Sequence, residues 1–159
     1  MIDVFPADYS DPEHGAALLD LLDAYALDPM GGGKALSAYT HEHLVRSLAE
    51  RDDAVTVFAR VGGKYVGLVN CFEGFSTFAC RPLLNIHDVV VLAQFRGRGV
   101  SVRMLEEVER IAGERGCCKL TLEVLDGNEI AKAAYLRLGF ARYELDPKLG
   151  GAVFWEKKL

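Results

Sequence analysis

A short run rich in glycine and arginine contains residue types that could bind an anion. The run Gln94–Gly99 (QFRGRG) follows the apolar stretch Val89–Leu92 and precedes a segment of helical spacing that starts at Val100 and Ser101. Glycine lets the backbone turn tightly and approach a ligand closely. The free N–H groups in the first turn of a helix attract anions, and the two arginines add full positive charge. We therefore expect this strand, turn and helix start to hold a diphosphate.

Other phosphate motifs do not match the chain. A dinucleotide-binding G-x-G-x-x-G motif would need glycine at Val102, and no G-K-[ST] follows the turn as a Walker A loop requires. Lys34 does follow three glycines, but Ala35 stands where a Walker A loop has Ser or Thr. We interpret Gly31–Gly33 as a flexible loop that could border a substrate cleft. An ordinary helix start remains the alternative interpretation of Gln94–Gly99.

A second motif lies downstream, where Asn128–Phe140 has the form N-x-x-A-x-x-x-Y-x-x-x-G-F. Asn128 is a typical N-cap, and Gly139 is a typical helix stop. Tyr135 lies two helical turns after Asn128, so both residues share one helix face. A phenol stays protonated at neutral pH and can donate its proton to a leaving group. The alternative for Tyr135 is a buried aromatic ring that packs on a sheet.

Together, the order and spacing of the two motifs resemble the GNAT superfamily of acetyl-coenzyme A-dependent N-acetyltransferases. The resemblance covers at least Leu84 to Phe140. It implies that the central strand pairs with the pantetheine arm and that a backbone N–H near Val91 polarises the thioester carbonyl. It also implies that Tyr135 protonates the departing thiolate and that Asn128, besides capping its helix, contacts the pantetheine arm or an ordered water. The cofactor-binding residues expected on this basis are Val89, Val90, Val91, Gln94, Arg96, Gly97, Arg98, Gly99, Val100, Ser101, Asn128 and Tyr135.

His87 is the residue that we expect to take the proton from the attacking amine. Imidazole accepts and releases protons near neutral pH, directly or through water. Regular strand alternation places His87, Val89 and Val91 on one face and Asp88 on the other, so Asp88 is expected to orient substrate or serve a structural role. Glu73, at the end of the preceding strand, is another candidate base and substrate contact. The alternative for His87 is a hydrogen-bonded core histidine.

The stretch before the central strand, Glu73–Leu83, resembles the corresponding stretch in the diamine (spermidine/spermine) branch of the family. That branch continues with the triplet L-E-D, whereas this chain has Ile86-His87-Asp88. A carboxylate that could bind the distal ammonium of a polyamine is therefore missing. A histidine at this place instead resembles the arylalkylamine acetyltransferases. The expected acceptor is a small-molecule primary amine, either diamine-like or arylalkylamine-like.

The periodicity of apolar residues predicts the order β-α-α-β-β-β-α-β-α-β-β. Glycines at 62 and 63 predict a hairpin. A right-handed crossover puts the strands that start at Leu84 and Lys119 parallel. The fold class is α/β (α+β), a GNAT-like mixed and mostly antiparallel sheet with helices on both faces. The resemblance implies that the cofactor lies where those two strands splay apart. Strands are expected over Ile2–Pro6, Ala54–Arg60, Tyr65–Phe72, Leu84–Leu92, Lys119–Leu125, Arg142–Leu145 and Ala152–Glu156. Helices are expected over His14–Leu27, Tyr39–Arg51, Val100–Arg115 and Glu129–Leu138.

Composition narrows the class of protein further. A length of 159 residues predicts a single domain, 1–159, and the net charge of −5 argues against a nucleic-acid partner. No apolar run is long enough to cross a membrane and no secretory signal is recognisable, so we expect no membrane partner and a cytoplasmic location. The four cysteines lack a C-x-x-C pair, which argues against a zinc site, and Cys117-Cys118 are expected to enter a buried strand.

The sequence thus predicts an acetyl-CoA-dependent N-acetyltransferase that needs no metal and works by direct attack in a ternary complex. Tyr135 is the expected acid and His87 the expected base. The resemblance also implies a homodimer. Two alternatives remain: the same fold acting on a protein N-terminus or lysine, and a non-catalytic acyl-CoA-binding sensor that has lost turnover.

Overall fold

The computed structural model describes all 159 residues, which form two compact units, Met1–Leu122 and Glu123–Leu159. The first unit contains a five-stranded sheet and three α-helices. Its strands are β1 (Ile2–Pro6), β2 (Ala54–Val61), β3 (Lys64–Ser76), β4 (Arg81–Val91) and β5 (Leu120–Leu122). Its helices are α1 (Pro12–Leu27), α2 (Ala38–Ala49) and α3 (Val100–Glu114), with short 3₁₀ turns η1 (Pro29–Gly31) and η2 (Ala93–Phe95). The second unit contains α4 (Glu129–Arg137) and the 3₁₀ turn η3 (Pro147–Leu149).

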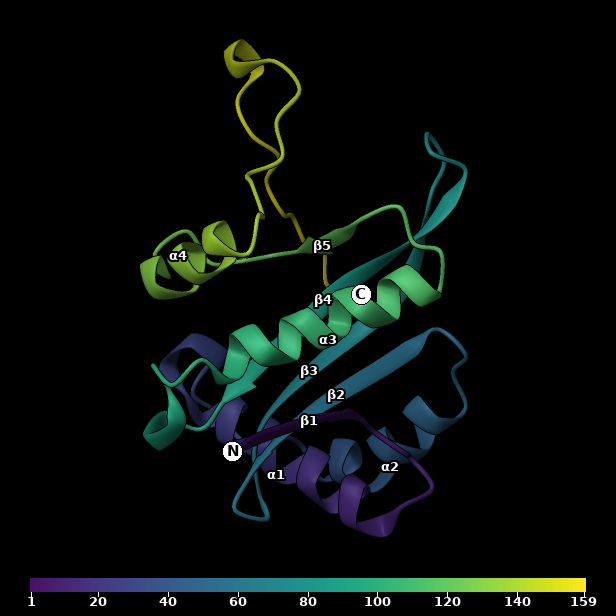
Figure 1. Ribbon diagram of the computed structural model, residues 1–159, viewed down its shortest axis with the longest axis vertical. Coiled ribbons are helices and arrows are strands. Elements are labelled where there is room, and N and C mark those ends of the chain that lie inside the picture. Colours follow the sequence, from purple (N-terminus) through teal and green to yellow (C-terminus); the bar gives the residue numbers. More distant parts are fainter. The chain divides into compact units, whose positions relative to one another are not determined.

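The strands lie side by side in the order β1-β2-β3-β4-β5 (Figure 1). The first three pairings are antiparallel, and β5 pairs with β4 in parallel after the crossover through α3. The turn between β2 and β3 places Gly62 and Gly63 at φ angles of 57° and 80°, which suit glycine. The predicted mixed, mostly antiparallel sheet is therefore confirmed.

Helices cover both faces of the sheet. Leu18 and Leu21 of α1 and Leu48 of α2 belong to one buried apolar cluster with Phe58 and Leu68 of the sheet. On the other face α3 crosses the strands, and the methyl group of its Met104 would lie only 3.0 Å from a Cβ placed at Gly67 (Figure 1). The helical spacing of apolar residues in α1 and α3 thus reflects burial against opposite faces of one sheet.

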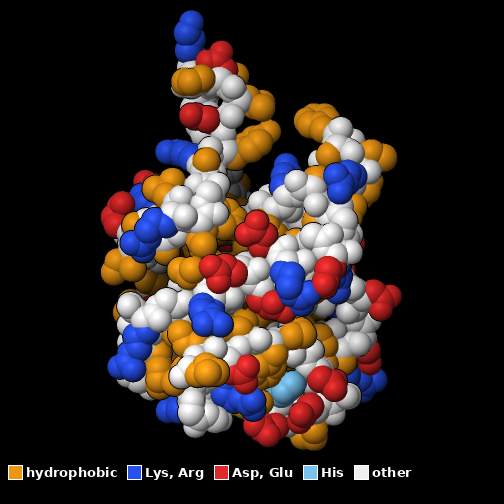
Figure 2. Space-filling model, viewed as in Figure 1, with side chains coloured by type: hydrophobic (Ala, Val, Ile, Leu, Met, Phe, Trp, Pro, Cys, Tyr) orange, Lys and Arg blue, Asp and Glu red, His pale blue; other side chains and the backbone are white.

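Strands β3 and β4 extend beyond their predicted ends as a two-stranded arm, with pairing that continues to Ser76 and Arg81. Hydrophobic side chains gather at the tip of this arm, where Phe78 is fully exposed and Phe75 largely so (Figure 2). Strand β5 is shorter than predicted because its pairing with β4 covers only three residues. The expectation that Cys117 and Cys118 enter a buried strand is wrong, because both precede β5 and are only half-buried.

The second unit begins its helix as predicted. The Asn128 side chain accepts a hydrogen bond from the backbone N–H of Ala131 (3.2 Å), and Gly139 follows the helix with a φ angle of 86°. The two late strands are not formed: a single isolated bridge joins Glu144 and Gly151. Strands need a partner and an apolar face, whereas Leu145 and Trp155 in these segments are more than 80% exposed.

No helix in the structure is long and apolar enough to cross a membrane.

Candidate active site

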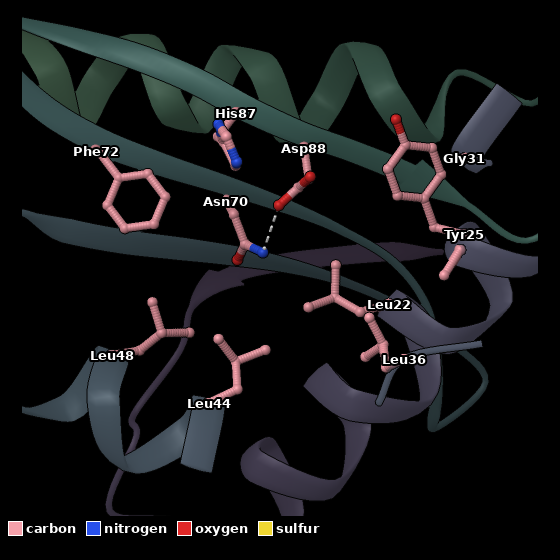
Figure 3. Close-up of a pocket in the computed structure, with 11 residues that line it drawn as sticks. Leu22, Tyr25, Gly31, Leu36, Leu44, Leu48, Asn70, Phe72, His87 and Asp88 are labelled. Carbon is pink, nitrogen blue, oxygen red and sulfur yellow. Dashed lines mark hydrogen bonds between the residues drawn. The ribbon is translucent and has the colours of Figure 1, made fainter. Parts of the chain in front are cut away.

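A cavity of about 340 Å³ lies within the first unit, between the sheet and helices α1 and α2 (Figure 3). Its walls are mostly apolar, and a few polar groups of β3 and β4 enter it from the sheet side. Concave apolar sites with a few convergent polar groups are typical small-molecule sites. The lining residues are Leu22, Tyr25, Ala26, Gly31, Leu36, Leu44, Leu48, Asn70, Phe72, His87 and Asp88.

A β-bulge in β4 determines which polar groups reach the cavity. Asn70 of β3 pairs with Asp88 and the next residue, Cys71, pairs with Ile86, so His87 is an extra residue in β4. A bulge interrupts the regular alternation of side chains and re-aims them. The prediction that His87 and Asp88 lie on opposite faces is therefore wrong, because both side chains line the same cavity (Figure 3).

His87 and Asp88 differ in their surroundings. The exposed His87 ring lies edge-on to Phe72, with 5.5 Å between ring centroids. Asp88 is half-buried, and its Oδ2 accepts a hydrogen bond of 3.0 Å from Nδ2 of Asn70. Across the cavity, burial raises the pKa of Tyr25, and the negative charges of Asp88 and Asp28 raise it further. The Tyr25 hydroxyl therefore keeps its proton and can donate a hydrogen bond at neutral pH.

Glu73, the third acidic or basic candidate of the sequence, does not line the cavity. Its carboxylate pairs with the guanidinium of Arg115 at 3.1 Å, and its backbone N–H donates to the carbonyl of Asp53. The side chain is thus held near the end of α3, and the structure brings it together with neither His87 nor Asp88. The geometry gives no support for Glu73 as a substrate contact.

The glycine-rich turn has the backbone that its sequence predicts. Gly97 and Gly99 adopt φ angles of 74° and 78°, and no side chain caps the start of α3 at Gly99. A Cβ at either glycine would meet no other atom within 4 Å, so the turn is open to a ligand. Arg98 is exposed, with its guanidinium over the Phe95 ring. Uncapped N–H groups beside an exposed arginine fit a diphosphate.

Arg96 is directed differently from Arg98. Its Nε donates to the carbonyl of Val91 (3.0 Å), and its terminal nitrogen pairs with the Asp28 carboxylate at 2.8 Å. The hydrogen bond from Arg96 holds the pKa of Asp28 below its ordinary value. Arg96 therefore ties the turn to the segment after α1, and a diphosphate would have to share or replace these partners.

The edge of β4 that faces β5 is only partly paired. Strand β5 pairs with Leu84–Ile86, whereas within the first unit no strand pairs with that edge from His87 to Val91. The register with β3 directs the backbone groups of Val90 to that strand, so Val89 and Val91 face the open edge. Their backbone groups are open to an extended ligand, as the splayed strands of the resemblance imply, except the Val91 carbonyl, which accepts from Arg96.

Asn128 and Tyr135, the remaining expected site residues, belong to the second unit. Asn128 caps α4, and the Tyr135 ring packs at 5.8 Å from the Phe140 ring. Several cavity residues were not expected from the sequence, notably Asn70, Tyr25 and Phe72. They come from separate elements that only the fold brings together, although an asparagine inside the apolar run Val66–Cys71 was an available signal.

The chain is similar to known proteins in sequence and in fold. The family model described as the acetyltransferase (GNAT) family matches residues 15–140. An uncharacterized N-acetyltransferase of Archaeoglobus fulgidus is 31% identical over 120 residues, which cover 72% of this chain and 79% of that protein. The thialysine N-epsilon-acetyltransferase of Mus musculus is 34% identical over 78 residues, 49% of this chain and 45% of that protein, so less than half of its length is matched. An aminoglycoside N-acetyltransferase solved in complex with CoA superposes with a TM-score of 0.75 at 18% identity, covering all of this chain and 96% of the other.

Proposed function

The chain belongs to the GNAT acetyltransferase family, and on that premise we propose that it transfers the acetyl group of acetyl-coenzyme A to a primary amine of a small molecule. The observation that carries the proposal is the concave cavity with His87 and Asp88 on one wall. It lies beside the partly unpaired edge of β4, and the glycine-rich turn follows β4 in the same unit. An acceptor amine and a thioester held along this edge would meet at β4.

Different residues of this chain bind different parts of the cofactor and the acceptor. The backbone N–H groups of Gly97–Ser101 and the Arg98 side chain bind the diphosphate of coenzyme A. The backbone of Val89–Val91 pairs with the pantetheine arm, and an N–H group near Val91 donates to the thioester carbonyl. A preorganised donor at such a carbonyl lowers the barrier by about 3 kcal/mol. Asp88 attracts the acceptor ammonium into the cavity.

Two side chains move protons in this proposal. His87 accepts the proton that the ammonium must lose before its nitrogen can attack the thioester. Tyr135 donates its phenolic proton to the departing thiolate, since a phenol is still protonated at neutral pH. Attack is direct, in a ternary complex. No cysteine is needed, and Cys71 is buried away from solvent.

Among the similar proteins, those named for thialysine and aminoglycosides support a small-molecule acceptor. A structural neighbour described as a ribosomal-protein-alanine N-acetyltransferase is the reason to keep peptides in the test. The concave cavity favours the small molecule, because its apolar walls can surround a compact apolar body.

The proposal is tested by mass-spectrometric detection of acetylated product from pools of arylalkylamines, diamines, aminoglycosides and short peptides. We expect product from an amine pool with acetyl-coenzyme A. Tyr135→Phe should lower kcat about a hundredfold, the scale of a lost general acid. Tyr143→Phe, a largely exposed tyrosine of the same unit, is the matched control and should leave kcat unchanged.

Product from peptides alone would overturn the small-molecule proposal while leaving acetyl transfer intact. Binding of acetyl-coenzyme A without product from any pool would instead support the non-catalytic sensor.

A further inference from the structure

The two buried polar side chains of the first unit form a hydrogen-bonded chain that ends at the cavity. Thr56 and Asn70 are 2% and 5% exposed, and they lie beside each other on β2 and β3. The Thr56 hydroxyl donates to Oδ1 of Asn70 at 2.6 Å, and Nδ2 of Asn70 donates to Oδ2 of Asp88 at 3.0 Å. Tyr9, in the segment between β1 and α1, is 2.8 Å from the Thr56 hydroxyl.

In this series of hydrogen bonds every donor points toward Asp88. A hydroxyl carries one proton, and that of Thr56 is used toward Asn70, so the Tyr9 hydroxyl must donate to Thr56. The order is Tyr9 to Thr56 to Asn70 to Asp88. Aligned hydrogen bonds polarise one another, so the members of such a chain hold each other in place. The hydrogen-bonded chain therefore fixes the Asp88 carboxylate in one orientation at the cavity wall.

Only one oxygen of the Asp88 carboxylate takes part in this hydrogen-bonded series. Oδ2 is held by Asn70, which leaves Oδ1 to face the cavity (Figure 3). Leu44 and Leu48 of α2 and Leu22 of α1 lie on the helix side of the cavity, and the Phe72 ring lies at one end (Figure 3). The cavity thus offers a single carboxylate within apolar walls. A second ammonium group would find no second carboxylate among the residues that line the cavity, so its charge would be left without a counter-ion, which is costly.

We propose that Tyr9, Thr56 and Asn70 are positioning residues that hold Asp88 as the anchor for the acceptor ammonium, and that the acceptor is an amine with one positive charge and an apolar body. The inference rests on the proposed function, because it names the acceptor class of that same site. It separates this chain from enzymes of polyamines or aminoglycosides, whose additional charges would need carboxylates that the cavity lacks.

Direct binding tests this inference independently of turnover. The probes are 2-phenylethylamine, its neutral analogue 2-phenylethanol and spermidine, measured by calorimetry with and without coenzyme A. We expect 2-phenylethylamine to bind at least tenfold more tightly than spermidine. Asp88→Asn should weaken 2-phenylethylamine about a hundredfold, since a charged hydrogen bond is lost, and leave 2-phenylethanol unchanged.

The positioning role is tested by a pair of variants at one site. Thr56→Val removes the hydroxyl at constant shape, and Thr56→Ser keeps it. We expect Thr56→Val to raise the KM, or Kd, for the amine about tenfold with kcat and acetyl-coenzyme A affinity unchanged, and Thr56→Ser to restore it. Tyr9→Phe, at the outer end, should show a smaller effect of the same kind even if Thr56→Val folds poorly. Tyr39→Phe on α2, an exposed tyrosine, is the control.

Three results would overturn the inference. One is tighter binding of spermidine than of 2-phenylethylamine. Another is that Asp88→Asn weakens the binding of 2-phenylethylamine and of 2-phenylethanol equally. The third is an absence of binding by every amine with coenzyme A present. Acetylation of a peptide in the same preparation would then show that the protein transfers acetyl groups but that its acceptor does not belong to this class.

Discussion

Cys71 is the buried neighbour of the polar chain, one residue after Asn70 on β3. Its side chain is 1% exposed, and burial, with a smaller contribution from the negative charge of Asp88, raises the pKa of its thiol to about 12. A thiol reacts as its thiolate, so Cys71 should be unreactive in the folded protein. Cys80 on the β3–β4 arm is exposed and should react freely.

We therefore predict that iodoacetamide at about pH 8 modifies Cys80 at least a hundredfold faster than Cys71. Peptide mapping by mass spectrometry checks this, and Cys80→Ser should remove the fast site. In the unfolded chain the thiol ionises near its ordinary pKa of 9.0, whereas in the fold it does not until about 12. The free energy of unfolding should thus fall as pH rises between these values, less so in Cys71→Ala. Equal labelling of both cysteines in folded protein would show that the β2–β3 core opens readily.

At the scale of elements, the contact between β3 and α3 depends on a glycine of β3, Gly67, which has no side chain. A Cβ at Gly67 would lie 2.7 Å from the carbonyl oxygen of Val90 and 3.0 Å from Met104. The first of these atoms is backbone in the adjacent strand, so it cannot simply turn aside. The close approach of β3, β4 and α3 thus requires glycine at this position.

We predict that Gly67→Ala lowers the free energy of unfolding by about 2–3 kcal/mol, the usual scale of overpacking. Gly113→Ala is the matched control, because that glycine lies in α3 with nothing near its Cβ position. It should raise stability by about 0.5–1 kcal/mol through helix propensity. Urea unfolding measures both. An unchanged midpoint in Gly67→Ala would mean that α3 can shift away from the sheet at little cost.

The sequence predicted the features that neighbouring residues determine, and it missed features that depend on contacts between distant segments. The apolar spacing of α3 and the Gly62-Gly63 turn are written in adjacent residues, so both were predicted within a residue or two. The bulge at His87 arises from how β4 pairs with Asn70 and Cys71, which alternation alone cannot reveal. The expected late strands failed similarly, because strand formation depends on a partner as well as on β-propensity.

The same division holds for the candidate site. His87 and Asp88 could be chosen from residue type and from the family resemblance. Asn70, Tyr25 and Leu48 could not, because they lie on three elements far apart in the chain and meet only in the folded unit. Thr56 and Asn70 do carry a signal in the sequence, because polar residues inside two apolar strands have to satisfy each other's hydrogen bonds.

At the scale of the first unit as a whole, one ion pair links the acceptor side to the phosphate side. Asp28 begins the η1 turn, whose Gly31 lines the cavity, and Arg96 lies in the glycine-rich turn before α3. Their contact of 2.8 Å spans segments that are distant in sequence. Asp28 competes with a diphosphate for Arg96 and adds a negative charge beside it. Each effect opposes binding of coenzyme A.

We therefore predict that Asp28→Asn tightens acetyl-coenzyme A binding roughly threefold at low salt, and less at high salt because charges are screened. Calorimetric titration at two salt concentrations measures this. Asp53→Asn, which removes the same charge from an exposed pair with Arg51 at the start of β2, should leave the affinity unchanged. Weaker binding in Asp28→Asn would mean that Asp28 instead holds Arg96 in the orientation that the diphosphate needs. Because η1 borders the cavity, that outcome would also mean that the contact between Arg96 and Asp28 couples cofactor binding to acceptor binding.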